Sequence, residues 1–120
     1  MILGIGTDIV EISRIERSIN NPSFLKKCYT QQEIEYCTRK GAVSFAGLFA
    51  AKEAVSKALG TGFLGFSPAD IRISRNKSGQ PMVELSDKVK TPPNSQIMLT
   101  IAHEKTFATA TAILVSLPVL

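Results

Sequence analysis

The chain has 120 residues, of which 44% are hydrophobic and 20% charged, and its formal net charge is +4. A chain of this length can bury one core without disulfides or metal staples, so we expect a single domain over residues 1–120. Its apolar runs are too short for a membrane span, and its first residues lack the basic and apolar regions of a signal peptide. We therefore expect a cytoplasmic protein with no membrane partner.

The two cysteines, Cys28 and Cys37, lie nine residues apart in what the pattern indicates is one helical region. On one straight helix they would be too far apart to form a disulfide, which predicts free thiols and a reducing compartment. Two such cysteines and a single histidine disfavour a zinc site, whereas a hard cation held by carboxylates stays possible.

The chain has a net charge of +4, and before residue 41 six lysines and arginines outnumber the four glutamates. A modest basic excess of this kind favours an acidic protein partner or a phosphorylated ligand. A small nucleic-acid-binding module is one alternative. It is disfavoured because no Lys/Arg run exceeds two residues and no strand interleaves aromatic with basic residues.

Residues 1–10 (MILGIGTDIV) predict a strand that contains two glycines. In a strand Gly4, Gly6 and Asp8 project from the same face, so a bare strip of backbone lies beside a carboxylate. Such a strip suits close approach of another backbone or of a ligand. The simpler interpretation, which the spacing alone favours, makes Asp8 the N-cap of the next helix, with Glu11 three residues later as in a capping box.

Three helices are expected before the centre of the chain, over residues 9–19, 24–28 and 30–40. The first is amphipathic and places Arg14 and Arg17 together on a face away from its isoleucines. The break at residues 20–23 contains proline and two asparagines. The third helix opens with Thr30 and Glu33 in capping-box spacing.

A fourth helix is predicted from near Val43 to Gly60, because this stretch is rich in alanine and Gly60 suits a left-handed helix end. Its predicted apolar stripe comprises Leu48, Ala51, Val55, Ala58 and Leu59, and its other side carries Phe49, Glu53, Ser56 and Lys57. Glu53 and Lys57 are four residues apart, and the simple interpretation is an exposed ion pair worth about 0.2–0.5 kcal/mol. The flanking alanines also allow another backbone to come close, which would hold both charges in a site.

Residues 61–68 form a glycine-rich loop that follows a helix C-terminus, unlike a phosphate-binding loop, which precedes a helix. The backbone amides of residues 60–62 could still contact a ligand. Strands are expected at 71–73, 82–85, 96–103 and 108–117, with a turn at 76–81 and a short helix at 86–89. His103, the only histidine, ends a strand beside Glu104 and Lys105, and a structural hydrogen bond is its simplest use.

Four segments together resemble the holo-acyl-carrier-protein synthases, the short 4′-phosphopantetheinyl transferases of fatty-acid synthesis. They are GIGTDIVE at 4–11, FAAKEA with SKALGTG between 49 and 62, GQP at 79–81, and IAHE at 101–104 leading into Phe107-Ala108. The segments occur in the family's order and span nearly the whole chain. The resemblance implies an α+β fold with an antiparallel sheet packed against helices, usually a homotrimer with sites between subunits.

The resemblance also implies transfer of 4′-phosphopantetheine from coenzyme A to a serine of apo acyl carrier protein. Mg²⁺ suits this chemistry because it takes oxygen ligands and needs only one or two carboxylates in addition to phosphates. The implied catalytic residues are Asp8, Glu53, Lys57 and His103, with Asp8 and Glu53 as the metal ligands. The implied coenzyme A contacts are Lys57, Gly60, Thr61, Pro81 and His103. Either Glu53 or a water held by the metal could accept the serine proton.

Acyl carrier proteins are acidic around the modified serine, so the resemblance predicts that Arg14 and Arg17 form the docking surface. Two residues depart from the family pattern. Leu48 stands where the family commonly has arginine, and Ala102 stands where it commonly has serine. Leu48 removes a cation near the nucleotide, and Ala102 removes a hydroxyl near the pyrophosphate. A further alternative is therefore an inactive protein that shares only the structure of these enzymes.

Overall fold

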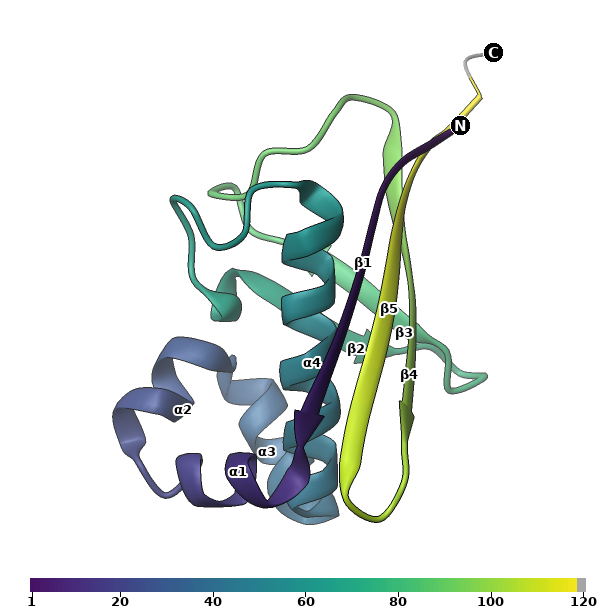
Figure 1. Cartoon of the computed structure of the whole chain (residues 1–120). Helices are drawn as coiled ribbons and strands as arrows, with labels where there is room; N and C mark the ends of the chain where they lie inside the picture. The colour runs from purple at the N-terminus through teal and green to yellow at the C-terminus, as the bar shows by residue number, and fades with distance from the viewer. Residues whose placement is uncertain (119–120) are drawn as a thin grey trace.

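The computed structural model describes residues 1–118 and centres on one long helix, α4, which lies between a sheet and a group of shorter helices (Figure 1). The elements in chain order are β1 (Ile2–Glu11), α1 (Ile12–Ser18), α2 (Pro22–Cys28), α3 (Gln31–Lys40), α4 (Ala42–Leu59), the 3-10 turn η1 (Pro68–Asp70), β2 (Ile71–Arg75), β3 (Pro81–Leu85), β4 (Ser95–His103) and β5 (Phe107–Ser116). One antiparallel sheet has the order β1-β5-β4, and β2 pairs with β3 in a second. The α+β prediction is confirmed.

The first strand is longer than expected and the first helix correspondingly shorter. Val10 and Glu11 still pair with β5, so α1 begins at Ile12 rather than at Ile9. Asp8 pairs with Ala110 inside the strand, and Glu11 occupies the N-cap position of α1 without a side-chain cap bond. The N-cap interpretation of Asp8 is therefore wrong, because pairing with a distant strand outweighs the local capping pattern.

The cysteines lie on two helices rather than one. Cys28 ends α2 and Cys37 lies in α3, and the chain between them is extended at Tyr29. Both cysteines are buried and form no disulfide, which confirms the prediction of free thiols. Burial raises the pKa of Cys37 to about 12. The helix α2 starts two residues earlier than expected. Pro22 suits its first turn, and Asn21 Oδ1 caps it by accepting from the Ser23 amide at 2.9 Å.

The helices α3 and α4 have the predicted ends. Both capping-box bonds between Thr30 and Glu33 are present at the start of α3, and Gly60 ends α4 with a φ of 81°. The side of α4 that was expected to face solvent is largely covered, however, and Phe49 and Ser56 are buried. The reason is that α4 contacts β1 and β5 on one side and α1, α3 and β2 on others.

The second half of the chain follows the expected strands with one exception. Residues 86–89 form a turn instead of a short helix: the Val89 amide donates to the Ser86 carbonyl, and the Ser86 amide donates to Asp70 O. None of the helices in the described part of the chain is both long and apolar enough to cross a membrane.

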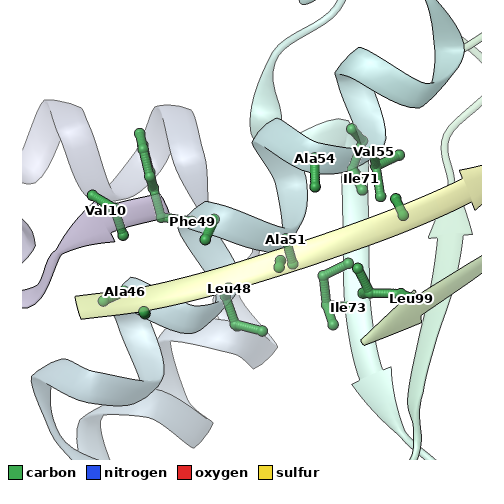
Figure 2. Close-up of a cluster of buried hydrophobic side chains, with 14 of the residues drawn as sticks. Val10, Ala46, Leu48, Phe49, Ala51, Ala54, Val55, Ile71, Ile73 and Leu99 are labelled. Carbon is green, nitrogen blue, oxygen red and sulfur yellow. The ribbon is translucent and has the colours of Figure 1, made fainter. Parts of the chain in front are cut away.

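The core lies where α4 meets the two sheets (Figure 2). Its labelled members in that view are Val10, Ala46, Leu48, Phe49, Ala51, Ala54, Val55, Ile71, Ile73 and Leu99. Half of the labelled side chains from α4 are alanines, and those from the second sheet and β4 are branched. Small residues on the helix let the strands lie close to its axis, which determines how closely β1 can approach.

The closest packing is between the backbone of β1 and the backbone of α4. A Cβ atom on Gly4 would overlap the carbonyl oxygen of Ala58, and one on Gly6 would overlap the carbonyl oxygen of Ala54. The bare glycine strip predicted from the sequence therefore receives another backbone. Because Asp8 projects from this same face, the contact carries its carboxylate to the C-terminal half of α4.

Gly6→Ala should destabilise the fold by about 3 kcal/mol or more, at the upper end of overpacking costs, because the obstacle is backbone that cannot rotate away. Urea unfolding measures the loss. Gly60→Ala is the control, since Gly60 has a left-handed φ of 81° but no atom within 4 Å of the added carbon, and only a left-handed cost of about 1–2 kcal/mol is expected. Equal losses in the two variants would contradict the packing argument.

Candidate active site

Asp8 and Lys57 form an ion pair between β1 and α4. Lys57 Nζ lies 3.2 Å from Asp8 Oδ1 and donates to the Thr7 carbonyl at 2.9 Å. The side chain of Lys57 is 52% exposed and that of Asp8 is 18% exposed, so the pair lies at the edge of solvent. The i,i+4 ion pair expected between Lys57 and Glu53 is absent from the described residues, because the approach of β1 offers Lys57 a carboxylate and a carbonyl together.

Glu53 lies one turn before Lys57 on the same helix and is half-buried. Burial raises the pKa of Glu53, the Asp8 carboxylate raises it further, and Lys57 and Arg14 act in the opposite direction. Asp8 is thus close enough for its charge to disfavour the ionised form of Glu53, although the two carboxylates are far apart in the sequence. The fold brings together three of the predicted site residues, namely Asp8, Glu53 and Lys57.

The carboxylate pair suits a hard cation. Within residues 1–118 no group of three or more His, Cys, Asp or Glu side chains converges, so the chain offers a pair of oxygen donors and no complete cage. Mg²⁺ binds well in such places, since it keeps several waters and takes further ligands from substrate phosphates. A cation between Asp8 and Glu53 would also offset the repulsion that raises the pKa of Glu53. The residues present therefore fit this ion.

A cavity of about 330 Å³ opens beside Glu53. It is lined by Phe24, Lys27, Cys28, Phe49, Glu53, Phe63, Phe66, Ser67 and Pro68. Most of its wall is apolar, with Glu53 and Lys27 as the charged members. The sequence pattern gave no signal for this cavity, because its phenylalanines come from α2, α4 and the loop after α4 and meet only in the folded chain.

Arg14 also borders the site. Its guanidinium lies 5.7 Å from the centre of the Phe49 ring, and its charge lowers the pKa of Glu53. Arg17 is exposed one turn further along α1. Both arginines are therefore on the helix that leaves the Asp8 strand, and Arg14 has an electrostatic effect on the carboxylate site that spacing alone did not predict.

Gly60 and Thr61 continue directly from the helix that carries Glu53 and Lys57. The Gly60 amide donates to the Lys57 carbonyl at 3.0 Å, and the Thr61 hydroxyl donates to the Gly62 carbonyl at 3.0 Å. Thr61 is exposed. These residues lie at the end of α4, one turn beyond Lys57.

His103 and Pro81 lie away from Asp8 within one chain. His103 is the exposed last residue of β4, with β5 between it and β1, and the β4 residue in line with Asp8 is Ile101. Two strand spacings correspond to roughly 10 Å across the sheet. Pro81 begins β3 and lines a separate groove between β3 and β4. His103 and Pro81, two of the five predicted coenzyme A contacts, therefore do not lie beside Asp8 and Glu53 in one chain.

The two positions that depart from the family pattern also lie outside the carboxylate site. Leu48 is buried and lines a third cavity with Arg72 and Arg75. Ala102 is exposed on β4 and pairs with Thr109.

A family model described as the 4′-phosphopantetheinyl transferase superfamily matches residues 4–112. A holo-[acyl-carrier-protein] synthase of Clostridium botulinum is 50% identical over 120 residues, covering 95% of this chain and 98% of that protein. A protein of the same name from Fusobacterium nucleatum is 44% identical over 121 residues, covering 95% of this chain and 99% of that protein. The resemblance drawn from the four sequence segments is confirmed.

Solved structures agree. The holo-(acyl-carrier-protein) synthase of Bacillus anthracis in complex with CoA (3′,5′-ADP) has a TM-score of 0.83 and 37% identity, covering 97% of this chain and 98% of that one. The Helicobacter pylori holo-[acyl-carrier-protein] synthase in complex with coenzyme A has a TM-score of 0.80 and 34% identity, covering 92% of this chain and 99% of that one. The chain belongs to the holo-[acyl-carrier-protein] synthase family of the 4′-phosphopantetheinyl transferase superfamily.

Proposed function

We propose that this chain transfers the 4′-phosphopantetheine group of coenzyme A to a serine of apo acyl carrier protein, with Mg²⁺ held by Asp8 and Glu53. The observation that supports this most is the convergence of Asp8, Glu53 and Lys57, because all three belong to the segments that resemble the family. Family membership supports coenzyme A as the substrate, since relatives with this fold have been crystallised in complex with it.

The reaction forms a bond between the serine oxygen and the phosphorus that bears the pantetheine, and it breaks the pyrophosphate bond. The leaving group is 3′,5′-ADP, on whose phosphate oxygens negative charge grows, and the serine proton passes to Glu53 or to water. A divalent cation at the carboxylate pair supplies charge neutralisation for such a step. Asp8 and Glu53 would hold it through their oxygens, and Lys57 adds a point charge that can turn from Asp8 toward phosphate.

The cavity beside Glu53 supports a place for the pantetheine arm. If a phosphate lies near Asp8 and Lys57, the pantetheine arm can extend past Glu53 into this cavity. The apolar wall formed by Phe24, Phe63 and their neighbours suits the dimethyl and methylene groups of the arm. The ammonium of Lys27 is the one other charged group in that wall. This placement keeps the reacting phosphate at the carboxylates and the thiol end away from them.

A homotrimer with sites between subunits would bring His103 and Pro81 to the site. The face of the main sheet away from α4 is open and partly apolar, with Ile5 68%, Ile9 66% and Met98 52% exposed. Ile5 and Met98 pair with the same β5 residue, Ile113, so they form one row across three strands. An exposed apolar face of this kind favours a second copy of the chain. His103 and Pro81 of a neighbouring subunit would then complete the coenzyme A contacts. We expect the reaction to take place in the cytoplasm.

The mass of an intact apo acyl carrier protein, incubated with this chain, coenzyme A and Mg²⁺, tests the function. We expect the mass to increase by one phosphopantetheine group and chelation of the cation to prevent the increase. A carrier protein of unchanged mass would favour the inactive relative, for which Leu48 and Ala102 are the departures. Salt-sensitive retention on nucleic acid without any transfer would favour the basic binding module.

Asp8→Asn and Glu53→Gln should each reduce transfer by roughly 100-fold or more, because each removes a charge that offsets the cation. Both replacements keep size and shape, so unfolding by urea should change little. The intact-mass assay at fixed Mg²⁺ measures the rate. Near-normal transfer by either variant would remove that carboxylate from the proposed metal site.

Lys57→Ala should lower kcat/KM for coenzyme A by about tenfold or more, since a hydrogen bond to a charged group contributes about 1.5–3 kcal/mol. Binding of coenzyme A by titration calorimetry separates affinity from turnover. If affinity and turnover were both unchanged, the ammonium of Lys57 would serve only to hold Asp8 and the Thr7 carbonyl.

Arg17→Glu should raise the KM for the carrier protein several-fold at low salt and leave the KM for coenzyme A unchanged, because rim charges mainly set association with a charged partner. Arg17 is a cleaner test than Arg14, whose guanidinium also acts on Glu53 and Phe49. Arg39→Glu, in the last turn of α3, makes the same charge change and should leave both values as they are. Equal carrier-protein KM values in the two variants would place the docking surface elsewhere.

A further inference from the structure

Lys52 immediately precedes Glu53 and takes no part in the chemistry proposed above. Its side chain is completely buried, and its ammonium donates to Glu33 Oε1 at 2.7 Å, to the Pro68 carbonyl at 3.1 Å and to the Ile71 carbonyl at 2.8 Å. An ammonium has three N–H donors, so every one is used. The position of this nitrogen is therefore fixed from three directions.

The partner carboxylate is held equally firmly. Glu33 Oε1 also accepts from the Thr30 amide at 2.8 Å, and Glu33 Oε2 accepts from the Ile73 amide at 2.8 Å. The ion pair therefore joins the start of α3, the middle of α4, the turn η1 and the strand β2. Every other buried side-chain nitrogen or oxygen in the described chain likewise has a hydrogen-bond partner.

Stability alone does not explain a buried ion pair. Replacing such a pair with apolar residues of similar volume is often neutral or stabilising, because both charges lose their hydration when buried. Apolar side chains cannot, however, replace the directed hydrogen bonds to Pro68 and Ile71. Pro68 is the first residue of η1 and Ile71 directly follows it, so both carbonyls lie where the glycine-rich segment of residues 60–67 ends.

The other end of residues 60–67 is attached to α4. The Gly60 amide donates to Lys57 O and the Gly62 amide to Ser56 O. Between the two attachments the segment has no regular structure, so its path depends on where its ends are held. It carries Phe63 and Phe66, whose rings pack edge to face at 5.6 Å and line the cavity beside Glu53.

We infer that Lys52 is a positioning residue for substrate binding: by holding the carbonyls of Pro68 and Ile71, it sets where Phe63 and Phe66 stand relative to Glu53. The wall of the cavity is thereby fixed to the same helix that carries the catalytic carboxylate. The identity of the ligand in the cavity, the pantetheine arm, rests on the proposed function. The position of the wall does not.

A fluorescent reporter tests the wall directly. The chain contains no tryptophan, so Phe66→Trp introduces a single indole at the cavity. In that background the double replacement Glu33→Gln with Lys52→Met removes both charges together and leaves no charge buried alone. We expect acrylamide quenching of the indole to rise about twofold or more and the KM for coenzyme A to rise about fivefold or more. The KM for the carrier protein should change little.

The matched control removes an exposed ion pair from the second sheet, with Arg72→Met and Glu84→Gln in the same Phe66→Trp background. It should alter neither quenching nor the KM for coenzyme A. The inference would be overturned if a folded Glu33→Gln/Lys52→Met variant had the same quenching and the same KM for coenzyme A as the Phe66→Trp parent. Equal changes in the two KM values without a change in quenching would also overturn it.

If the double variant does not fold, Lys52→Arg replaces it. Arginine keeps the charge for Glu33 but cannot place its planar donors on both carbonyls, so quenching and the KM for coenzyme A should both rise as in the double variant. Values equal to those of the Phe66→Trp parent would overturn the inference. Failure of the proposed function is distinguishable. It would show as no transfer by the parent chain, while quenching in the two double variants would still decide whether Lys52 positions the wall.

Discussion

The rest of the structure depends on the contact between the bare face of β1 and the backbone of α4. At Gly4 and Gly6 the helix carbonyls occupy the space that a side chain would need. Glycine in a strand costs conformational entropy and has no side chain to pack. The two glycines here are explained by the short distance between the backbones of β1 and α4 that they permit. The strand lies close enough for Asp8 to reach Lys57, and side chains at positions 4 and 6 would prevent this approach.

Local patterns predicted most of the secondary structure, because capping, alternation and helix ends are short-range properties. The Thr30 capping box and the left-handed Gly60 are examples. Asp8 was harder to interpret. Its candidate capping-box partner, Glu11, lies three residues away, whereas the β5 residue that pairs with it is Ala110, about a hundred residues later. The partner of Lys57 was misjudged for the same reason, since a four-residue spacing is visible in the sequence and an approaching strand is not.

Two features of the site could not be read from the sequence at all. The cavity beside Glu53 collects phenylalanines from three separate segments, and the remote positions of His103 and Pro81 depend on sheet order. Lys52 did leave a signal. It falls at the same helical spacing as Leu48, Val55 and Leu59, and a lysine on an apolar stripe indicates a buried cation that needs a carboxylate partner. That partner, Glu33, was identified only as a capping residue.

Lys52 and Glu53 are consecutive, so their side chains leave α4 in directions about 100° apart and meet different surroundings. Lys52 is fully compensated by Glu33 and by the carbonyls of Pro68 and Ile71, so it adds no net charge to the candidate site. The charges of Asp8 and Glu53 are offset by those of Lys57 and Arg14, so these four charges nearly cancel one another. A site of this kind gains nothing from a cation alone beyond relief of the carboxylate repulsion. A divalent cation that arrives with an anionic pyrophosphate, in contrast, keeps the balance near zero and frees Lys57 to face phosphate. If Mg²⁺ is held as proposed, its binding and that of coenzyme A should therefore reinforce each other, because each supplies the charge that the other lacks.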